Sequence, residues 1–592
     1  MPQRQRRRTL ALAAAAIAFV AAPLLLPEFH VTLLDYIGLA TLVVLGLVVM
    51  TGVAGIVSFG QQAFVGIAAY TTALLTTQAG WSPWAGLAAC LALVGAAALL
   101  LGAVTLRLSG HYLSIATIAW GIAIYFLFGT LPGLGQYSGI DNLPPVAIAG
   151  FAFDTGRKSF FLIWACTVAA LVGAQRLLDS RSGRAIRALR FRSVMAESCG
   201  VDTGRLKLVV FVYAALLAGV SGWLHAHYLR FVSPHAFGVN AGIDYLFMAV
   251  IGGAGQVWGA LVGAGVMTVL KEWLKDLLPR LFSATGNYEI IVFGALMLML
   301  LHRTRDGIAP ALQRWLPASA AAPQPPADAA APPARKRPAA GAPLLQVQGL
   351  SKRFGGLVAV KDLSFDIAAG EIVGLIGPNG AGKSTVFNLV SGTLAASSGS
   401  VALQGEAIAG LPARAIARRG IARSFQHVNL VSRMSVLDNV ALGAYLRGRK
   451  GTLAAMLRLD RAEEACLHAE AARQIARVGL AAQMHASAGS LPLGQQRIVE
   501  IARGLAADPL LLMLDEPAAG LRYGEKQALA ALLRQLRAEG LAILLVEHDM
   551  EFVMGLVDRL VVMDFGERIA AGQPAQVQRD AAVIEAYLGG VA

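Results

Sequence analysis

Glu371-Ile-Val-Gly-Leu-Ile-Gly-Pro-Asn-Gly-Ala-Gly-Lys-Ser-Thr385 is the stretch that decides the fold of the second half of this chain. After Glu371 comes the short apolar run Ile-Val-Gly-Leu-Ile376, which is typical of a buried strand, and the rest fits the pattern G-x-x-x-x-G-K-[ST]. Glycines in this pattern let backbone N–H groups surround phosphates at the N-terminus of the next helix. The stretch therefore predicts a phosphate-binding loop in an α/β domain.

The loop supplies the first candidate site residues. Lys383 is placed to neutralise the β and γ phosphates of a nucleotide, and Ser384 can bind Mg²⁺. The other loop residues expected to contact the nucleotide are Gly377, Asn379, Gly380, Gly382 and Thr385. We therefore expect ATP and Mg²⁺ as cofactors.

A second buried run, Leu510 to Leu514, ends in the adjacent acids Asp515 and Glu516. Asp515 would hold Mg²⁺ directly or through water, and Glu516 can polarise the water that attacks the γ-phosphate. A further strand-like run covers Ala542 to Val546, and amphipathic helical stretches lie between such runs. The region after Leu344 is the right size for one nucleotide-binding domain with a helical insertion.

The first half has a different composition. The chain of 592 residues is 56% hydrophobic and only 15% charged, whereas globular proteins carry about 25% charged residues. No charged residue or histidine occurs from Tyr36 to Leu106. Because a bilayer core needs ~20 apolar residues per helix, this stretch holds about three crossings. A single soluble enzyme is excluded.

The basic loop from Arg176 to Lys207 and the residues Arg303 and Arg305 are expected in the cytoplasm. The chain must then cross the membrane an even number of times between them, but three apolar runs lie there. One of these runs, Tyr245 to Leu270, is rich in glycine. It is either a re-entrant or broken helix, or a helix whose glycines allow close packing. We expect about eight crossings in residues 1–305, with ten as the alternative.

Two further segments complete the organisation. Leu10 to Leu26 follows several arginines and could be a signal peptide, but we expect an uncleaved first helix with its N-terminus in the cytosol. Residues 306–343 are rich in Ala and Pro, which predicts a semi-extended tether that allows several dockings. The net charge is +14 over the whole chain and +10 through Arg305, and the charges of this first part lie between apolar runs, which indicates membrane orientation and no nucleic acid partner.

The second half resembles the ABC-transporter ATPase family. Beside the phosphate loop and the acidic strand end, Arg423-Ser-Phe-Gln426 looks like the Q-loop of that family. Leu491-Pro-Leu-Gly-Gln-Gln496 is similar to the signature LSGGQ, and His548 is similar to the switch histidine. These five elements occur in the family's order and cover essentially all of residues 344–592.

The resemblance implies roles for single residues. Gln426 would sense Mg²⁺ and couple to the permease, and His548 would contact the γ-phosphate. Phe354 matches the aromatic residue that stacks on adenine, although a lone Phe is more often part of a core. Gly494 and Gln495 belong to the signature and would act on a nucleotide held by a partner ATPase. The implied catalytic residues are Lys383, Glu516 and His548, and the implied Mg²⁺ ligands are Ser384, Gln426 and Asp515.

Two positions depart from the family pattern. Pro492 replaces the signature Ser and so removes a hydroxyl that would bond the γ-phosphate, and Arg522 stands where Asp is frequent. Gly494 preserves the close backbone approach. We therefore expect the phosphate contact to be retained but weakened, at the partner's site.

Each half also resembles one subgroup, the branched-chain amino acid importers. The ATPase resemblance lies in Val347 to Val360, Gly494 to Arg503 and Ile584 to Gly589, and the permease resemblance in Ser58 to Tyr70, Gly110 to Thr117 and Ser182 to Arg190. The resemblance implies a multi-domain chain. A polytopic all-α transmembrane permease domain (1–305) would be followed by a linker (306–343) and an α/β P-loop ABC ATPase domain (344–592).

The function implied is ATP-driven import of branched-chain or other hydrophobic amino acids across the bacterial inner membrane, with the ATPase in the cytoplasm. The implied partners are a second permease subunit, a second ABC ATPase subunit, a periplasmic solute-binding protein, the lipid bilayer and a small amino acid substrate. Three alternatives stay open. They are an importer of urea, amides or aromatic acids, an ABC exporter half-transporter, and a membrane-anchored ATPase that signals or scaffolds.

Two features of the permease half have more than one interpretation from the sequence alone. The resemblance implies that Arg184 to Gly200 is a cytoplasmic coupling helix that docks on the ATPase; the segment also fits a plain positive-inside loop, and both can be true. Gln61, Gln62, Tyr70 and Asn240 are polar residues in or beside apolar sequence. Such groups either face a transport pathway or pack between helices.

Overall fold

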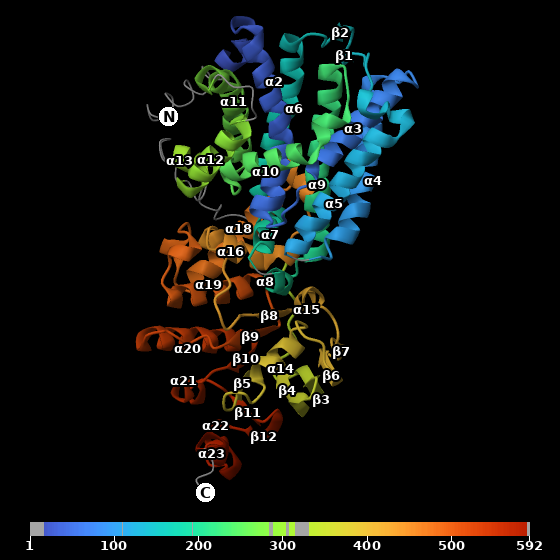
Figure 1. The fold of residues 1–592 in the computed structure, drawn as a ribbon. Helices are drawn as coiled ribbons and strands as arrows, with labels where there is room; N and C mark the ends of the chain where they lie inside the picture. Colours follow the sequence, from blue (N-terminus) through green and yellow to red (C-terminus); the bar gives the residue numbers. More distant parts are fainter. Residues whose placement is uncertain are drawn as a thin grey trace, which may run out of the picture. The chain divides into compact units, whose positions relative to one another are not determined.

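The computed structural model describes residues 17–108, 110–191, 193–282, 288–303, 307–313 and 331–588. The chain divides into two units (Figure 1). The helical unit contains Met1–Leu177 and Gly204–Ala320, and the α/β unit contains Leu178–Thr203 and Ala321–Ala592. Most of the basic loop of the first half, residues 178–203, therefore belongs to the α/β unit.

The helical unit is built from apolar helices. Among the described residues, six spans are long and apolar enough to cross a bilayer: α2 with the π-helix η1 (Glu28–Leu47 and Val48–Val53), α4 (Pro83–Thr105), α5 (His111–Thr130), α6 (Gly156–Leu178), α9 (Thr203–Leu229) and the first part of α11 (Val257–Phe282). The shorter helices are α3 (Gln61–Thr77), α10 (Val239–Gly253), α12 (Tyr288–Arg303) and α13 (Ile308–Gln313). The number of crossings stays a prediction, and Leu10 to Ala16 lie outside the described residues.

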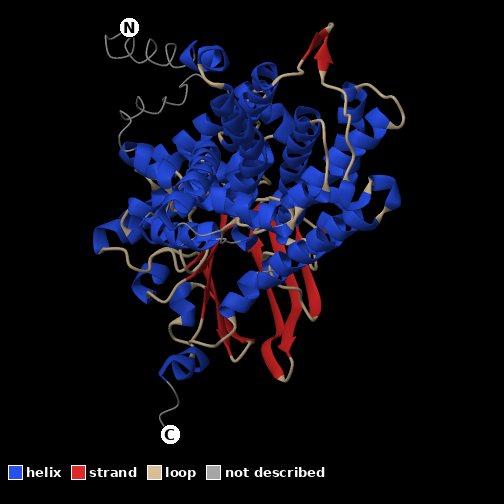
Figure 2. Ribbon diagram, turned by 45° about the horizontal axis from the view of Figure 1, so that its top comes forward, coloured by secondary structure: helices blue, strands red, loops and turns tan. Residues whose placement is uncertain are grey.

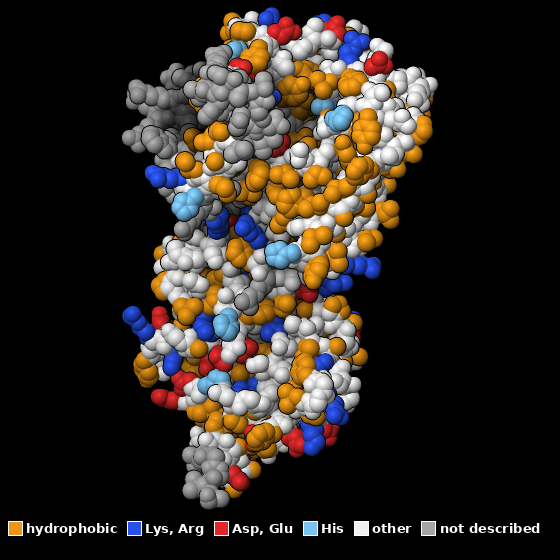
Figure 3. Space-filling view, viewed as in Figure 1, with side chains coloured by type: hydrophobic (Ala, Val, Ile, Leu, Met, Phe, Trp, Pro, Cys, Tyr) orange, Lys and Arg blue, Asp and Glu red, His pale blue; other side chains and the backbone are white. Residues whose placement is uncertain are grey.

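Apolar side chains gather on the surface of the helical unit (Figure 3). On α4, Leu99, Leu100 and Val104 are exposed, and Ile115 and Phe126 of α5 are exposed as well. A helix face of this kind suits contact with lipid and not with water. The helical unit also contains a short antiparallel hairpin of β1 (Ala147–Ile148) and β2 (Phe151–Ala152), drawn in red among the helices of this unit in Figure 2.

The glycine-rich run is both broken and closely packed. It forms two helices, α10 and α11, which are separated by a turn after Gly253. A Cβ atom on Gly252 would lie 1.8 Å from the carbonyl oxygen of Gly259, and one on Gly263 would lie 1.8 Å from that of Met248. Because these contacts pair the end of α10 with the start of α11, the two helices run antiparallel. Among the described residues, α9, α10, α11 and α12 follow the basic loop, and of these four helices α9 and α11 are long and apolar enough to cross a bilayer.

The centre of the α/β unit is a six-stranded sheet with the order β12-β11-β5-β10-β9-β8. Its strands are β5 (Ile372–Ile376), β8 (Ile421–Arg423), β9 (Leu511–Asp515), β10 (Ala542–Val546), β11 (Arg559–Asp564) and β12 (Glu567–Gly572). All neighbours pair in parallel except β11 and β12. The carboxyl ends of β5, β8, β9 and β10 therefore meet at one edge of the sheet.

A second sheet and two sets of helices surround this edge. The second sheet contains β3 (Pro343–Phe354), β4 (Leu357–Ala368), β6 (Ser398–Leu403) and β7 (Glu406–Ala407). The helices near the sheets are α14 (Lys383–Val390), α15 (Ala413–Arg419), α20 (Tyr523–Ala538), α21 (Met550–Met554), α22 (Pro574–Val577) and α23 (Ala581–Leu588). The helical insertion contains α16 (Val436–Gly443), α17 (Thr452–Met456), α18 (Arg461–Arg477) and α19 (Leu493–Ala506). The insertion has its own apolar core.

The described part of the linker, residues 331–343, is docked on the α/β unit. The sequence predicted a tether here that allows several dockings. The backbone N–H of Arg335 donates to Oδ2 of Asp508 at 2.5 Å, and Nη1 of Arg337 donates to the carbonyl of Glu539 at 2.7 Å. Arg447 of the insertion donates to the carbonyl of Pro332 at 2.9 Å. An extended proline-rich backbone has no internal hydrogen bonds, so its carbonyls are available for such contacts.

Candidate functional site

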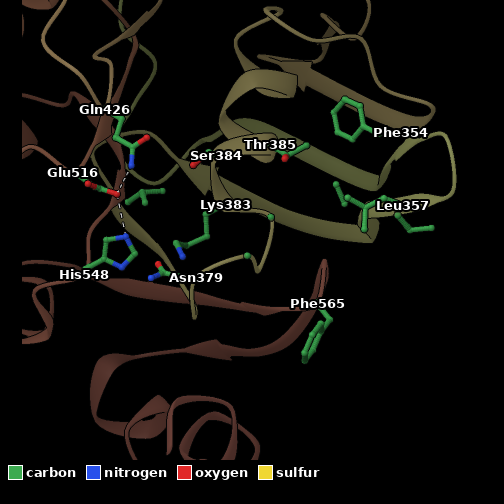
Figure 4. Close-up of a pocket in the computed structure, with 15 residues that line it drawn as sticks. Phe354, Leu357, Asn379, Lys383, Ser384, Thr385, Gln426, Glu516, His548 and Phe565 are labelled. Carbon is green, nitrogen blue, oxygen red and sulfur yellow. Dashed lines mark hydrogen bonds and ion pairs between the residues drawn. The ribbon is translucent and has the colours of Figure 1, made fainter. Parts of the chain in front are cut away.

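The predicted catalytic residues follow neighbouring strands of the six-stranded sheet. Gly377 follows β5, Gln426 lies just beyond β8, Glu516 follows β9, and His548 lies just beyond β10. Gln426, Glu516 and His548 line a cavity of about 440 Å³ together with residues of the phosphate loop, whereas Gly377 does not line it (Figure 4). The cavity is lined by Phe354, Leu357, Val358, Ala359, Asn379, Gly380, Gly382, Lys383, Ser384, Thr385, Gln426, Glu516, Val546, His548 and Phe565. The structure thus brings most of the predicted site residues together.

Glu516 is the centre of a polar cluster. Its Oε1 accepts a hydrogen bond from Nε2 of Gln426 at 3.0 Å and lies 3.0 Å from Nε2 of His548 (Figure 4). Its backbone is left-handed, with φ of 50°, which is uncommon for a residue with a Cβ atom. Its backbone N–H donates to Val546 at 2.8 Å, and Arg497 donates to its carbonyl at 2.5 Å. These bonds hold the carboxylate toward the cavity.

The phosphate loop is shaped by close backbone contacts. A Cβ atom on Gly377 would lie 2.0 Å from the carbonyl oxygen of Met563 on β11, so only glycine fits there. Lys383 begins α14, and its Nζ donates to the carbonyls of Gly377 and Pro378 at 2.7 and 2.8 Å. Burial lowers the pKa of Lys383, and the charges of Glu516 and Asp515 oppose this shift. The loop therefore places a cation and a helix N-terminus at the cavity.

Asp515 lies behind the cavity and does not line it. Its side chain is buried, and Oδ1 has no hydrogen-bond partner among the described residues. Its backbone N–H donates to Oγ of Ser424 at 2.9 Å. Burial raises the pKa of Asp515, and the nearby charge of Arg423 lowers it in part. A buried carboxylate oxygen with no partner is suited to a cation.

The opposite end of the cavity is apolar. Phe354 lies there at the end of β3, and its ring is 5.1 Å from Nζ of Lys352. Leu357 and Phe565 lie at the same end of the cavity (Figure 4). The sequence reasoning missed Phe565. The motif Asp564-Phe565-Gly566 between two strand-like runs signals a turn, but it does not indicate which cavity the turn borders.

The signature residues do not line this cavity. Gly494 and Gln495 lie in the first turn of α19, and Pro492 precedes this helix without a side-chain cap. Gly494 packs close to Leu521, where a Cβ atom would lie 2.9 Å from a side-chain carbon. The structure describes one chain, so the action of these residues on a partner's nucleotide stays a prediction.

The basic segment between α6 and α9 docks on the insertion. It forms two helices, α7 (Arg181–Leu189) and α8 (Ser193–Ser198), where the sequence suggested one. Arg184 is 1% exposed, and its Nη1 lies 2.8 Å from Oε2 of Glu464 and 3.2 Å from Nε2 of His468. Arg181 donates to the carbonyls of Tyr445 and Gly448 at 2.7 and 2.9 Å. A buried and paired arginine distinguishes this segment from a plain basic loop.

Asp438 belongs to the same cluster of charged side chains as Arg184 and His468. Its Oδ1 lies 3.4 Å from Nε2 of His468, and Oγ of Ser435 donates to its Oδ2 at 2.8 Å. Burial raises the pKa of Asp438, but the hydrogen bonds of His468 and Ser435 and the charge of Arg184 lower it to about 2. The carboxylate is therefore ionised at neutral pH.

The polar candidates in the helical unit separate into two groups. Gln61, Gln62 and Tyr70 are buried between helices, whereas Asn240 is exposed. Oε1 of each glutamine and the hydroxyl of Tyr70 have no hydrogen-bond partner among the described residues. Gln62 fits between Gly121 and Gly242, since a Cβ atom on either would contact its amide. The three buried residues therefore lie in the packing between helices, and none of the four is assigned to substrate contact.

Comparison with known proteins matches both halves of the chain. Residues 29–301 match the family described as branched-chain amino acid transport system, permease component. Residues 360–519 match the ABC transporter family, and residues 567–592 match the family described as branched-chain amino acid ATP-binding cassette transporter.

Individual relatives cover the second half. The high-affinity branched-chain amino acid transport ATP-binding protein LivG of Escherichia coli strain K12 is 43% identical over 251 residues, which are 42% of this chain and 98% of LivG. The protein BraF of Pseudomonas aeruginosa, which has the same description, is 42% identical over the same shares. A crystal structure of a nucleotide-free ATP-binding cassette from an ABC transporter is 29% identical with a TM-score of 0.38, and the match covers 42% of this chain and 100% of that chain.

Proposed function

Because this chain belongs to the branched-chain amino acid ABC transporter family and joins a permease and an ATP-binding cassette, we propose that it drives import of branched-chain or other hydrophobic amino acids. The import would cross the bacterial inner membrane, with the cassette in the cytoplasm. The observation that carries the proposal is the convergence of Gln426 and His548 on one carboxylate oxygen of Glu516 beside the phosphate loop. This arrangement lies in the same unit as the docked helices α7 and α8.

The cavity suits hydrolysis of ATP. Lys383 and the N-terminus of α14 would bind the phosphates, and Glu516 would accept a proton from the attacking water. Gln426 and His548 keep Oε1 of Glu516 oriented toward this water, and His548 would also contact the γ-phosphate. The catalytic residues proposed are therefore Glu516, His548 and Lys383.

The residues around the phosphate loop also fit Mg²⁺. Ser384 and Gln426 line the cavity, and Asp515 has a buried carboxylate oxygen without a partner. These three residues would hold the ion. When bound, Mg²⁺ neutralises charge on the β and γ phosphates.

One chain does not supply a complete transporter. Gly494 and Gln495 lie outside the cavity of their own cassette, so we propose that they act on the nucleotide of a second ABC ATPase subunit. A second permease subunit would complete the pathway through the lipid bilayer, and a periplasmic solute-binding protein would deliver the substrate. Pro492 would weaken the contact with the partner's γ-phosphate, because it lacks a hydroxyl.

The helices α7 and α8 would carry the movement of the cassette to the permease. Arg181 and Arg184 bind the insertion, which also bears the signature. A shift of the insertion on ATP binding would therefore move α7. The domain division 1–305, 306–343 and 344–592 follows from the same proposal, with an even number of crossings.

Uptake of labelled solute tests the proposed substrate class. Proteoliposomes containing this chain, its partner subunits and the binding protein should accumulate labelled leucine in the presence of ATP. Unlabelled valine and isoleucine should compete with it, whereas urea, an amide and an aromatic acid should not. Uptake of urea or an aromatic acid in place of leucine would assign the chain to another importer class, and ATP-dependent efflux would assign it to export.

A further inference from the structure

We propose that Phe565 forms a second face of the base subsite in the nucleotide cavity and contacts the purine ring of ATP. This inference rests on the proposed function, because it assumes that the cavity binds ATP. Phe354 and Phe565 come from different sheets and border the same apolar end of the cavity (Figure 4). In Figure 4 they lie on the side of the cavity away from Glu516 and His548, with Leu357 between them.

The exposure of Phe565 is the first argument. Its side chain is 88% exposed, compared with 46% for Phe354. A single exposed apolar residue is common on protein surfaces, but this one borders the cavity of the catalytic residues. Stacking on a purine would remove much of its ring from water.

The conformation of the turn is the second argument. Phe565 has a φ of 41°, which an L-residue with a Cβ atom adopts only at a cost. Its backbone N–H donates to Oδ1 of Asp564 at 3.0 Å, which stabilises this conformation. Glycine would adopt it more easily, so the side chain of Phe565 comes with a cost in backbone strain.

The position of the turn is fixed relative to the phosphate loop. The N–H of Gly566 donates to the carbonyl of Ala381 at 3.1 Å, and the N–H of Lys361 donates to the carbonyl of Gly566 at 2.8 Å. Ala381 belongs to the loop that would bind the phosphates, and Lys361 belongs to β4 beside the apolar end. The backbone of the turn that carries Phe565 is therefore tied to the loop that would bind the phosphates.

The chemistry of this end selects a flat apolar group. The side chains that line it are Phe354, Leu357, Val358, Ala359 and Phe565, and none of them is polar. They can contact the faces of a base but offer no side-chain hydrogen bond to its edges. Aromatic contact of this kind is effective for any base, since every base has a π face.

The test compares binding of Mg-ATP with binding of inorganic tripolyphosphate, which has the phosphates but no base. The full chain in nanodiscs is measured by calorimetry as wild type, Phe565→Ala, Phe565→Trp and Leu459→Ala. Leu459 is also an exposed apolar residue but lies outside the cavity. We expect Phe565→Ala to weaken ATP binding about fivefold or more and to leave tripolyphosphate binding unchanged. Phe565→Trp should retain wild-type affinity, and so should Leu459→Ala.

Two results would overturn the inference. ATP affinity of Phe565→Ala equal to that of the wild type would show that the ring makes no useful contact. An equal loss of ATP and tripolyphosphate affinity would show that the turn acts only through the shape of the phosphate loop. Failure of the wild-type chain to bind ATP would instead contradict the proposed function itself.

Discussion

Arg184 of α7 and Glu464 of α18 form a buried ion pair, with 2.8 Å between Nη1 and Oε2. Arg184 belongs to the permease half of the sequence, and Glu464 belongs to the insertion of the cassette. The pair therefore fixes a segment of the permease sequence on the part of the cassette that bears the signature. Removal of one partner from such a pair leaves an uncompensated buried charge, which costs about 3–5 kcal/mol.

A charge exchange tests the role of this pair. Arg184→Glu and Glu464→Arg should each abolish stimulation of ATP hydrolysis by substrate-loaded binding protein, while basal hydrolysis persists. The double variant should recover part of the stimulation. As a control, Arg414→Ala breaks an exposed ion pair with Asp202 of 3.4 Å and should change little. Full coupling in both single variants would show that α7 does not transmit the signal.

Asp438 gives a prediction about pH. Its pKa is lowered to about 2 in the folded chain, so its stabilising effect is present above the ordinary pKa of about 4 and is lost only as the pH falls toward 2. Asp438→Asn should reduce the free energy of unfolding by about 1 kcal/mol, after allowance for its partial exposure. Thermal unfolding should show the same deficit at pH 7 and at pH 5. A deficit that disappears at pH 5 would contradict the pairing described.

The docked linker predicts protection from hydrogen exchange. Asp508→Ala removes the acceptor of the Arg335 N–H, and a charge-assisted bond of this kind contributes about 1.5–3 kcal/mol. Amide exchange at residues 334–337 should accelerate about tenfold or more, measured by mass spectrometry on the full chain. Lys336→Ala is the matched control, because it removes a positive charge whose side chain is exposed. Equal acceleration in both variants would show that charge alone, and not docking, protects the segment.

Pro492 predicts a gain of function. It precedes α19 without capping the helix, and a serine there would accept a hydrogen bond from the first turn and contribute about 1 kcal/mol. Pro492→Ser should raise the unfolding temperature and should increase ATP hydrolysis severalfold in the assembled transporter. Pro492→Ala lacks the hydroxyl and serves as the comparison. Equal rates of ATP hydrolysis in the Ser and Ala variants would show that the missing hydroxyl does not limit hydrolysis.

The sequence predicted the nucleotide cavity well because its residues follow buried strands. Once β5, β9 and β10 are recognised as parallel neighbours, the positions of Gly377, Glu516 and His548 are determined by the sheet. The predicted strand Ala542 to Val546 is confirmed without change, and Leu510 to Leu514 is shifted by one residue. Local pattern and tertiary structure agree in these segments.

Other features depend on contacts between distant segments. Phe565 reaches the cavity because Gly566 bonds to the phosphate loop, a contact that no local pattern indicates. The linker is held because Asp508 and Arg447 supply partners to a segment that has no structure of its own. The sequence of the glycine-rich run is interpreted either as a broken helix or as a closely packed one, and both features are present. A turn after Gly253 separates α10 from α11, and the glycines of the two helices lie in close contact.

ATP hydrolysis in proteoliposomes tests the central claim most directly. The full chain is reconstituted with a second permease and a second ATPase subunit, and hydrolysis is measured with binding protein, with and without leucine, beside Glu516→Gln. We predict that leucine-loaded binding protein stimulates hydrolysis in the wild type and that Glu516→Gln lowers the rate about a hundredfold or more. Hydrolysis that is equal with and without loaded binding protein, or unchanged in Glu516→Gln, would contradict the claim that this site drives amino acid import.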